Sequence, residues 1–203
     1  MTLFHLLRHG EHALAGRILP GRLAGVGLSA KGQEEAALAA LRLETEGIEA
    51  LYSSPLERTR ETAAIVASTL KLPLSFREDL IEIDYGNWTG KRIEEIKADP
   101  LWQEWRERRA FARVPGGESM REVQNRVLDA LFDLRARHRG GRVLLVSHGD
   151  VIRAALLYAL GLPLDLYARI EVGIGSLSTL SFEESGMRVL LLNERPRKKR
   201  QAP

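Results

Sequence analysis

Two histidines in this chain follow short apolar runs, each at the point where the run ends. Leu3–Leu7 leads into an Arg-His-Gly sequence that holds Arg8 and His9, and Val143–Val146 leads into a Ser-His-Gly sequence that holds His148. Both runs have the pattern of buried parallel strands stopped by glycine. Because ligands of open α/β sheets bind at the carboxyl ends of the strands, we expect these three side chains to meet in one crevice. Two histidines and an arginine in such a place are suited to phosphate chemistry.

The patterns along the rest of the chain predict the frame that would hold these groups. Apolar runs predict strands at Phe4–Leu7, Ile48–Tyr52, Leu74–Phe76 and Val143–Val146, and a closing hairpin of Leu177–Phe182 and Arg188–Leu192. Helices are predicted from an N-cap at Ser29 to about Glu46, at Leu56–Leu70, irregularly at Ile93–Phe111, and at Glu118–His138 and Val151–Leu160. This alternation predicts an α/β fold of three layers, α/β/α, around a mainly parallel mixed sheet whose hairpin adds an antiparallel strand at an edge.

A helical insertion at about residues 85–114 interrupts the alternation. Insertions that follow a strand end commonly cover an active site, so we expect this one to form a small lid over it. Trp102 and Trp105 have helical spacing and are expected to form the core of the insertion. Lining a pocket for an apolar substrate group is the alternative.

Length and composition describe an ordinary soluble domain. The chain has 203 residues, of which 44% are hydrophobic and 28% charged, and it has no cysteine. Disulfides, thiolate catalysis and cysteine-bound metals are therefore excluded. No apolar run approaches the roughly 20 residues of a membrane span, and the N-terminus has no basic segment followed by a long apolar one. We expect a cytoplasmic protein with no membrane partner.

The basic residues are concentrated in the last ten positions, from Glu194 to Pro203. Five basic residues and one acidic residue lie there, so the net charge of this segment exceeds the formal net charge of +3 of the whole chain. We expect one domain at residues 1–193 and a disordered basic tail at 194–203. No aromatic residues interleave the charges of the tail, so we expect no nucleic-acid partner.

Six short motifs follow one another in a fixed order along the chain. They are Arg8-His9-Gly10-Glu11, Leu28-Ser29 with Gly32, Ser53-Ser54-Pro55-Leu56 with Arg58 and Thr62-Ala63, Glu82 with Gly86, Trp88 and Gly90, Pro115-Gly116-Gly117-Glu118-Ser119, and Ser147-His148-Gly149. The series resembles the histidine phosphatase superfamily, which includes the cofactor-dependent phosphoglycerate mutases. It extends from residue 3 to about 182.

The resemblance implies a role for each strand-end residue. His9 matches the nucleophile of the family, which holds the phosphoryl group covalently until water removes it. Arg8 would bind the non-bridging oxygens, and its charge favours neutral His9. His148 would stabilise the transition state by donating a hydrogen bond, beside the Gly149 backbone at a helix start. The alternative for both histidines is a structural role only.

Arg58 matches the second phosphate-binding arginine of the family, because a guanidinium can bind a phosphoryl group with two hydrogen bonds. Arg60 is the local competitor, but it lies two residues further, about 200° around the helix. We therefore expect Arg60 to face solvent. The alternative is that both side chains are surface charges.

The general acid must come from the acidic loop that holds Glu78, Asp79, Glu82 and Asp84. Glu82 fits the spacing of the motif, and its neighbours Ile81 and Ile83 would raise its pKa, as a general acid at neutral pH requires. Asp84 is the alternative. A solvated loop without catalytic function is the other interpretation.

The first loop departs from the family pattern at two positions. Family members often carry an Asn that contacts phosphate six residues after the nucleophile, where this chain has Ala15, and His12 replaces a frequent Ser or Thr. Arg17 or Arg22 could supply the missing contact or bind a second anionic group of the substrate. Solvent-facing arginines are the alternative.

The function expected from these residues is phosphatase chemistry without a metal. Two arginines and two histidines already neutralise a phosphate, His5, His12 and His138 complete no metal-binding pattern, and no cofactor is needed. We expect hydrolysis of a small phosphomonoester. The alternatives are phosphoglycerate mutase-type transfer, for which family members are usually longer, and a non-catalytic module that binds phospho-ligands. An exposed strand of the closing hairpin would permit a homodimer.

Overall fold

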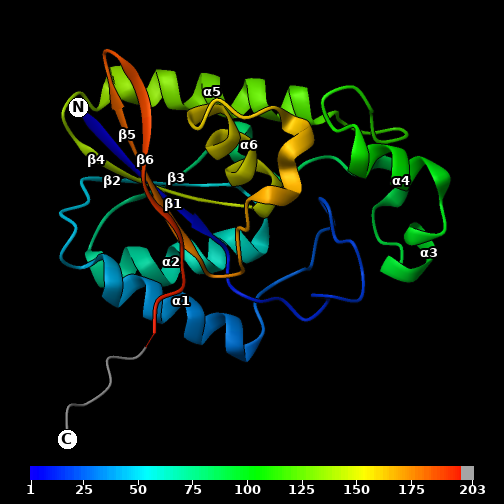
Figure 1. Ribbon diagram of the computed structural model, residues 1–203. Helices are drawn as coiled ribbons and strands as arrows, with labels where there is room; N and C mark the ends of the chain where they lie inside the picture. The colour runs from blue at the N-terminus through cyan, green and yellow to red at the C-terminus, as the bar shows by residue number, and fades with distance from the viewer. Residues whose placement is uncertain (198–203) are drawn as a thin grey trace, which may run out of the picture.

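The computed structural model describes residues 1–197, which form a three-layer α/β/α fold (Figure 1). The strands are β1 Thr2–Arg8, β2 Ala50–Ser53, β3 Leu74–Phe76, β4 Arg142–Ser147, β5 Leu177–Glu183 and β6 Gly186–Glu194. They form one mixed sheet in the order β3-β2-β4-β1-β5-β6. Strands β1 to β4 pair in parallel, and β5 is antiparallel to both of its neighbours. The expected fold is confirmed.

Helices cover both faces of the sheet. They are α1 Ala30–Leu43, α2 Glu57–Leu70, α3 Ile93–Lys97, α4 Pro100–Glu107, α5 Met120–Arg137 and α6 Gly149–Ala159. Figure 1 shows α1 and α2 below the sheet and α5 and α6 above it. None of the helices described is long and apolar enough to cross a membrane.

The central strands are apolar on both faces because both faces are covered. Phe4 and Leu6 of β1 pack into the core beneath α5 and α6, whereas Leu7 packs with the residues of α1 and α2. In the parallel pair of β1 and β4, Arg8 lies opposite Ser147, so the two strands end at the same level. This register brings His9 and His148 to one edge of the sheet.

Side-chain caps set the starts of two helices. Ser29 caps α1, as expected, and its hydroxyl accepts from the backbone N–H of Gly32. Ser119 caps α5 in a reciprocal pair with Glu122. Helix α5 therefore begins at Met120 rather than at Glu118, because the backbone of Glu118 instead donates to the carbonyl of Asp84.

The insertion at residues 85–114 contains two short helices, α3 and α4, which extend from one side of the molecule (Figure 1). Trp88 and Trp105 are fully buried, and the ring of Trp102 lies 5.2 Å from each of theirs, centroid to centroid. Phe111 is 73% exposed. The expected aromatic core of the insertion is present, without Phe111.

Two residues of the expected tail, Glu194 and Arg195, make defined contacts with the domain. Strand β6 includes Glu194, whose carboxylate accepts from Arg42, and Arg195 forms an ion pair with Glu171 at 2.8 Å. The rest of the expected basic tail, residues 198–203, lies outside the described residues. Pairing with a second copy through the edge strand β6 stays a prediction.

Candidate active site

A cavity of about 240 Å³ opens at the carboxyl ends of β1 and β4. Among the residues that line it are Arg8, His9, Arg58, Glu82 and Gly149. His148 is fully buried beside it, and its ring centroid lies 5.2 Å from that of His9. The structure thus brings together six of the residues that the sequence singled out, from four separate segments of the chain.

The ring of His9 is held in one orientation by the backbone. Its Nδ1 lies 2.8 Å from the carbonyl oxygen of Gly10, so Nδ1 carries the proton and donates it there. This tautomer leaves a lone pair on Nε2. Burial, and then the charges of Arg58 and Arg8, hold the pKa of His9 well below its usual range. The ring of His9 is therefore neutral at physiological pH, and its free Nε2 has the lone pair that a nucleophile requires.

The loop after His9 depends on two glycines that touch. A Cβ on Gly10 would lie 2.3 Å from the carbonyl oxygen of Gly32, closer than any side chain allows. The backbone N–H of Gly10 also donates to the hydroxyl of Thr62, at 3.1 Å, on the helix that carries Arg58. The spacing of three of the sequence motifs follows from this one contact region.

His148 is oriented by Ser54, whose hydroxyl lies 2.7 Å from Nε2. The Ser54 oxygen also accepts from the backbone N–H of Leu56 at 3.4 Å, and its own proton can be donated to Nε2. When Ser54 donates to Nε2, the proton of His148 is on Nδ1, which is buried, has no hydrogen-bond partner within residues 1–197 and lies 3.9 Å from a carboxylate oxygen of Glu82. An N–H in this position can donate to a bound anion.

Two arginines supply the positive charge of the site, and Arg58 is fully buried whereas Arg8 is half-buried. Arg58 is 1% exposed and donates from Nη2 to the carbonyl of Gly21 at 2.8 Å, and Arg8 donates from Nη1 to that of Val172 at 2.7 Å. Nε of both side chains and Nη1 of Arg58 have no partner in the part of the chain that the structure describes. Buried guanidinium groups with free donors indicate an anionic ligand.

Arg60 and Gly149 show how these two arginines are placed. Arg60 is exposed, as its helical position predicted, with its guanidinium 5.4 Å from the ring centroid of Phe76. A Cβ on Gly149 would lie 3.2 Å from the Cζ of Arg8. Glycine at the first position of α6 therefore allows the guanidinium of Arg8 to lie against the start of this helix, where backbone N–H groups also favour anions.

Glu82 has the environment of a carboxylic acid that keeps its proton. It is 8% exposed, and burial followed by the charge of Asp150 raises its pKa to about 7, against the opposing effect of Arg58. Asp84, the alternative acid, has a side chain that is 41% exposed and accepts from the backbone N–H of Gly86. Of the acidic residues of this loop, Glu82 is the one that lines the cavity.

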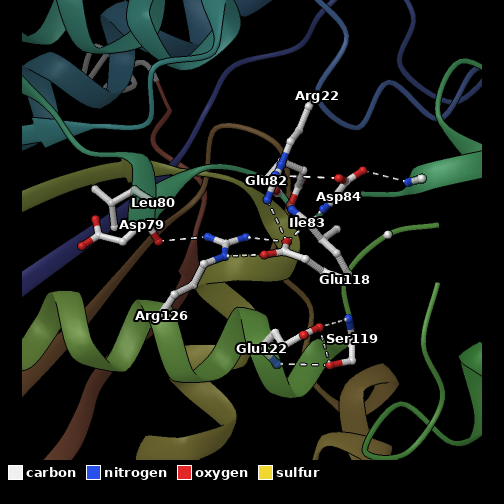
Figure 2. Close-up of polar contacts among 12 residues, drawn as sticks. Arg22, Asp79, Leu80, Glu82, Ile83, Asp84, Glu118, Ser119, Glu122 and Arg126 are labelled. Carbon is white, nitrogen blue, oxygen red and sulfur yellow. Dashed lines mark hydrogen bonds and ion pairs between the residues drawn. The ribbon is translucent and has the colours of Figure 1, made fainter. Parts of the chain in front are cut away.

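The loop that carries Glu82 is fixed by a network around Glu118 (Figure 2). The Glu118 carboxylate accepts from the backbone N–H of Asp84 at 3.0 Å and from Arg126 at 3.1 Å, while Arg126 also donates to the carbonyl of Asp79 at 2.9 Å. Arg22 donates to the carbonyl of Glu82 and to Glu118, both at 2.8 Å. Glu118 is structural, as its position after the glycine pair predicted.

Comparison with known proteins decides the family. The model of the histidine phosphatase superfamily (branch 1) matches residues 4–195. The chain belongs to this superfamily.

This histidine phosphatase is similar in sequence to two curated relatives, and similar in structure to one solved protein. Phosphoserine phosphatase 1 of Hydrogenobacter thermophilus is 35% identical over 82% of the chain and 80% of its own length. A Salmonella paratyphi B protein named "Probable phosphoglycerate mutase GpmB" is 33% identical over 91% and 87%. The structure of Bacillus stearothermophilus YhfR matches with a TM-score of 0.88 and 30% identity, over 94% of the chain and 96% of YhfR.

The two other arginines proposed from the sequence do not line the cavity of this histidine phosphatase. Arg17 is exposed and donates to the backbone carbonyl of Ala13. The guanidinium of Arg22 is bound to Glu82 and Glu118 in the network described above. Arg22 therefore holds the acidic loop in place. Neither Arg17 nor Arg22 lies at the cavity where a substrate contact was predicted.

Sequence reasoning did not assign several residues of the cavity wall to the site. Among them are His12, Tyr85, Asp150 and Arg153. The hydroxyl of Tyr85 donates to Asp150, and a guanidinium nitrogen of Arg153 lies 3.8 Å from the same carboxylate. The spacing of Asp150 and Arg153 in the first turn of α6 was a usable signal, because side chains three apart share one face of a helix. Within residues 1–197, no cluster of three or more His, Asp or Glu side chains is arranged to hold a metal ion.

Proposed function

We propose that this protein is a metal-independent phosphatase that hydrolyses a small phosphomonoester through a phosphohistidine intermediate on His9. The observation that carries the proposal is the neutral ring of His9, with Nε2 free, in a cavity that also presents the buried Arg58 and the half-buried Arg8. A cavity of about 240 Å³ supports a small substrate.

In the first step, Nε2 of His9 attacks phosphorus and the bond from phosphorus to the ester oxygen breaks. Glu82 gives its proton to the leaving alkoxide, so the substrate leaves as an alcohol. Arg8, Arg58 and the Nδ1–H of His148 would stabilise the charge on the phosphoryl oxygens. In the second step, water attacks phosphorus, the bond to Nε2 breaks, and Glu82 takes up the proton from water.

The same intermediate would also allow the phosphoryl group to return to the substrate, as in a phosphoglycerate mutase. The relative from Salmonella paratyphi B, 33% identical, makes transfer the second candidate. We favour hydrolysis because the insertion beside the cavity is small, and its only α-helices within the described residues are the short α3 and α4. The 85–114 insertion contributes Tyr85 and Ile93 to the cavity wall, which supports a role as a lid.

The names of the two curated relatives suggest where to look for the substrate. Phosphoserine and phosphoglycerate are both small, phosphorylated and carry a carboxylate, so both belong in the first substrate panel beside a generic aryl phosphate. Net release of inorganic phosphate identifies hydrolysis. Interconversion of the two phosphoglycerate isomers without release of phosphate identifies transfer instead.

Chelation is the direct test of a metal-free mechanism. We expect turnover of p-nitrophenyl phosphate by the intact chain to be unchanged, within about twofold, after dialysis against excess EDTA, because charged protein side chains replace the metal as electrostatic stabilisers. Activity that disappears with EDTA and returns with added Mg²⁺ or Zn²⁺ would overturn this part of the proposal.

Substitution of Arg58 with lysine is expected to lower kcat/KM about 30-fold or more. A lysine cannot donate to both the Gly21 carbonyl and a phosphoryl oxygen in the fixed geometry of a guanidinium. Loss of a buried charged hydrogen bond costs roughly 2 kcal/mol or more. Arg60→Lys, on the exposed side of the same helix, is the matched control and should behave as wild type. Equal kinetics for both variants would contradict the assignment of Arg58.

A further inference from the structure

His12 is a buried side chain whose ring makes no hydrogen bond to the residues that the structure describes. It is 6% exposed, and its Nδ1 is buried without a hydrogen-bond partner within residues 1–197. Its backbone is fixed by an isolated bridge to Leu28, so the ring is part of a defined loop. Buried polar atoms are almost always satisfied, and an unsatisfied one in the wall of a cavity points to a ligand.

The ring of His12 lies beside the proposed nucleophile. Its centroid is 5.6 Å from that of His9, and the two rings are tilted by 46°. His12 and Ala15 line the cavity together with both arginines of the site. A phosphoryl group on His9 would therefore lie within reach of His12.

The charge state of His12 suits a hydrogen bond rather than an ion pair. Burial, followed by the charges of Arg58 and Arg8, lowers its pKa to about 4. The neutral ring carries one N–H donor at physiological pH. It can bind a phosphoryl oxygen without adding a further positive charge beside the two arginines.

Other side chains of the same loop cannot make this contact. Ala15 has no donor, Arg17 donates to a backbone carbonyl at the surface, and Arg22 is held by Glu82 and Glu118. His12 is the side chain of the four that both lines the cavity and has a donor to offer.

We propose that His12 binds the phosphoryl group of the substrate through an N–H of its neutral ring, and so supplies the contact that Ala15 cannot make. The inference rests on the proposed function, because it assumes that the cavity takes a phosphoryl group. His12 is then a substrate-binding residue specific to the loop of this chain.

Binding of inorganic phosphate tests the proposal without any need for turnover. Calorimetric titration of the full chain should show about tenfold weaker binding for His12→Phe, which keeps a planar ring but has no donor. His12→Asn, which restores an N–H, should recover most of the affinity. A second pair of variants tests the same role without a phenylalanine at position 12. His12→Ala should bind phosphate as weakly as His12→Phe, and adding Ala15→Asn to His12→Ala should strengthen phosphate binding again.

The possible outcomes separate this inference from the proposed function. If wild type binds phosphate and both His12→Phe and His12→Ala bind it equally well, the role of His12 is wrong while the phosphatase proposal stands. Wild-type chain that binds no phosphate would overturn both. Weak phosphate binding by His12→Phe supports the proposed role of His12 under two conditions. The variant must unfold at a temperature close to that of wild type, and phosphate affinity must recover in His12→Asn or in the double variant His12→Ala with Ala15→Asn. Failure of both recoveries overturns the proposal, because a purely structural histidine would give the same loss.

Discussion

Replacement of His9 with alanine is expected to lower phosphomonoester turnover by about 10⁴-fold or more, because the variant lacks the atom that forms the covalent intermediate. The feature behind this expectation is the neutral ring of His9, whose Nε2 is left free by the hydrogen bond from Nδ1 to the Gly10 carbonyl. The measurement is hydrolysis of p-nitrophenyl phosphate, together with trapping of radiolabelled phosphate on the protein. Wild type should retain label that is labile to acid and stable to base, as expected of a phosphorus–nitrogen bond, and His9→Ala should retain none.

His138→Ala is the matched control for this experiment. His138 lies outside the cavity, where its Nε2 is 2.9 Å from the hydroxyl of Tyr52, so its loss should leave both turnover and labelling unchanged. Retained binding of inorganic phosphate by His9→Ala would show that Arg8 and Arg58 are still in place. Unchanged turnover in His9→Ala would exclude His9 as the nucleophile.

The meeting of His9 and His148 was predictable because it depends on strand ends. Both apolar runs are buried on two faces, which restricts them to the centre of a covered sheet, and parallel neighbours end at the same edge. The burial of Arg58 and the exposure of Arg60 were predictable for a similar reason, since helical periodicity puts residues two apart on different sides. Local periodicity thus predicted where the two histidines meet and that Arg58 and Arg60 lie on different sides of a helix. The choice of Arg58 and of Glu82 came from the motifs that resemble the family.

The loops that complete the site could not be predicted in the same way. Arg22 was a candidate for substrate binding because it lies beside a glycine, but its partner Glu118 is 96 residues further along the chain. Tyr85 and Asp150 are 65 residues apart and meet in the cavity wall. Burial of a charged side chain depends on partners that tertiary structure supplies, and neither periodicity nor motif spacing specifies them.

Replacement of Glu82 with glutamine is expected to slow hydrolysis of alkyl phosphates by about 10²-fold to 10⁴-fold, the usual contribution of a general acid. Glutamine has nearly the same shape and can still accept from the backbone N–H of Ile83, as Glu82 does at 3.0 Å, but it has no proton to give to the leaving group. p-Nitrophenolate is a weak base and leaves without a proton. The loss should therefore be far larger for phosphoserine or a phosphoglycerate, whichever wild type hydrolyses, than for p-nitrophenyl phosphate.

The pH dependence gives an independent measure of the same group. Because the pKa of Glu82 is raised to about 7, the carboxylic acid is present below that pH and is lost as the pH rises through it. Wild-type kcat for an alkyl phosphate should accordingly decline on the alkaline side of about pH 7, and the decline should be absent in Glu82→Gln. Burial is the largest cause of the shift, so the decline reflects the closed wall around this carboxyl group.

Asp84→Asn distinguishes a specific acid from a merely acidic loop. Asp84 lies two residues away with a side chain that is 41% exposed, and asparagine can still accept from the N–H of Gly86. We expect its rates and pH profile to match wild type. If Asp84→Asn instead removes the alkaline decline and Glu82→Gln leaves it in place, the proton comes from Asp84, and burial in the cavity wall is not what selects the acid. Equal losses on alkyl and aryl phosphates in Glu82→Gln would show that the loss does not arise from protonation of the leaving oxygen.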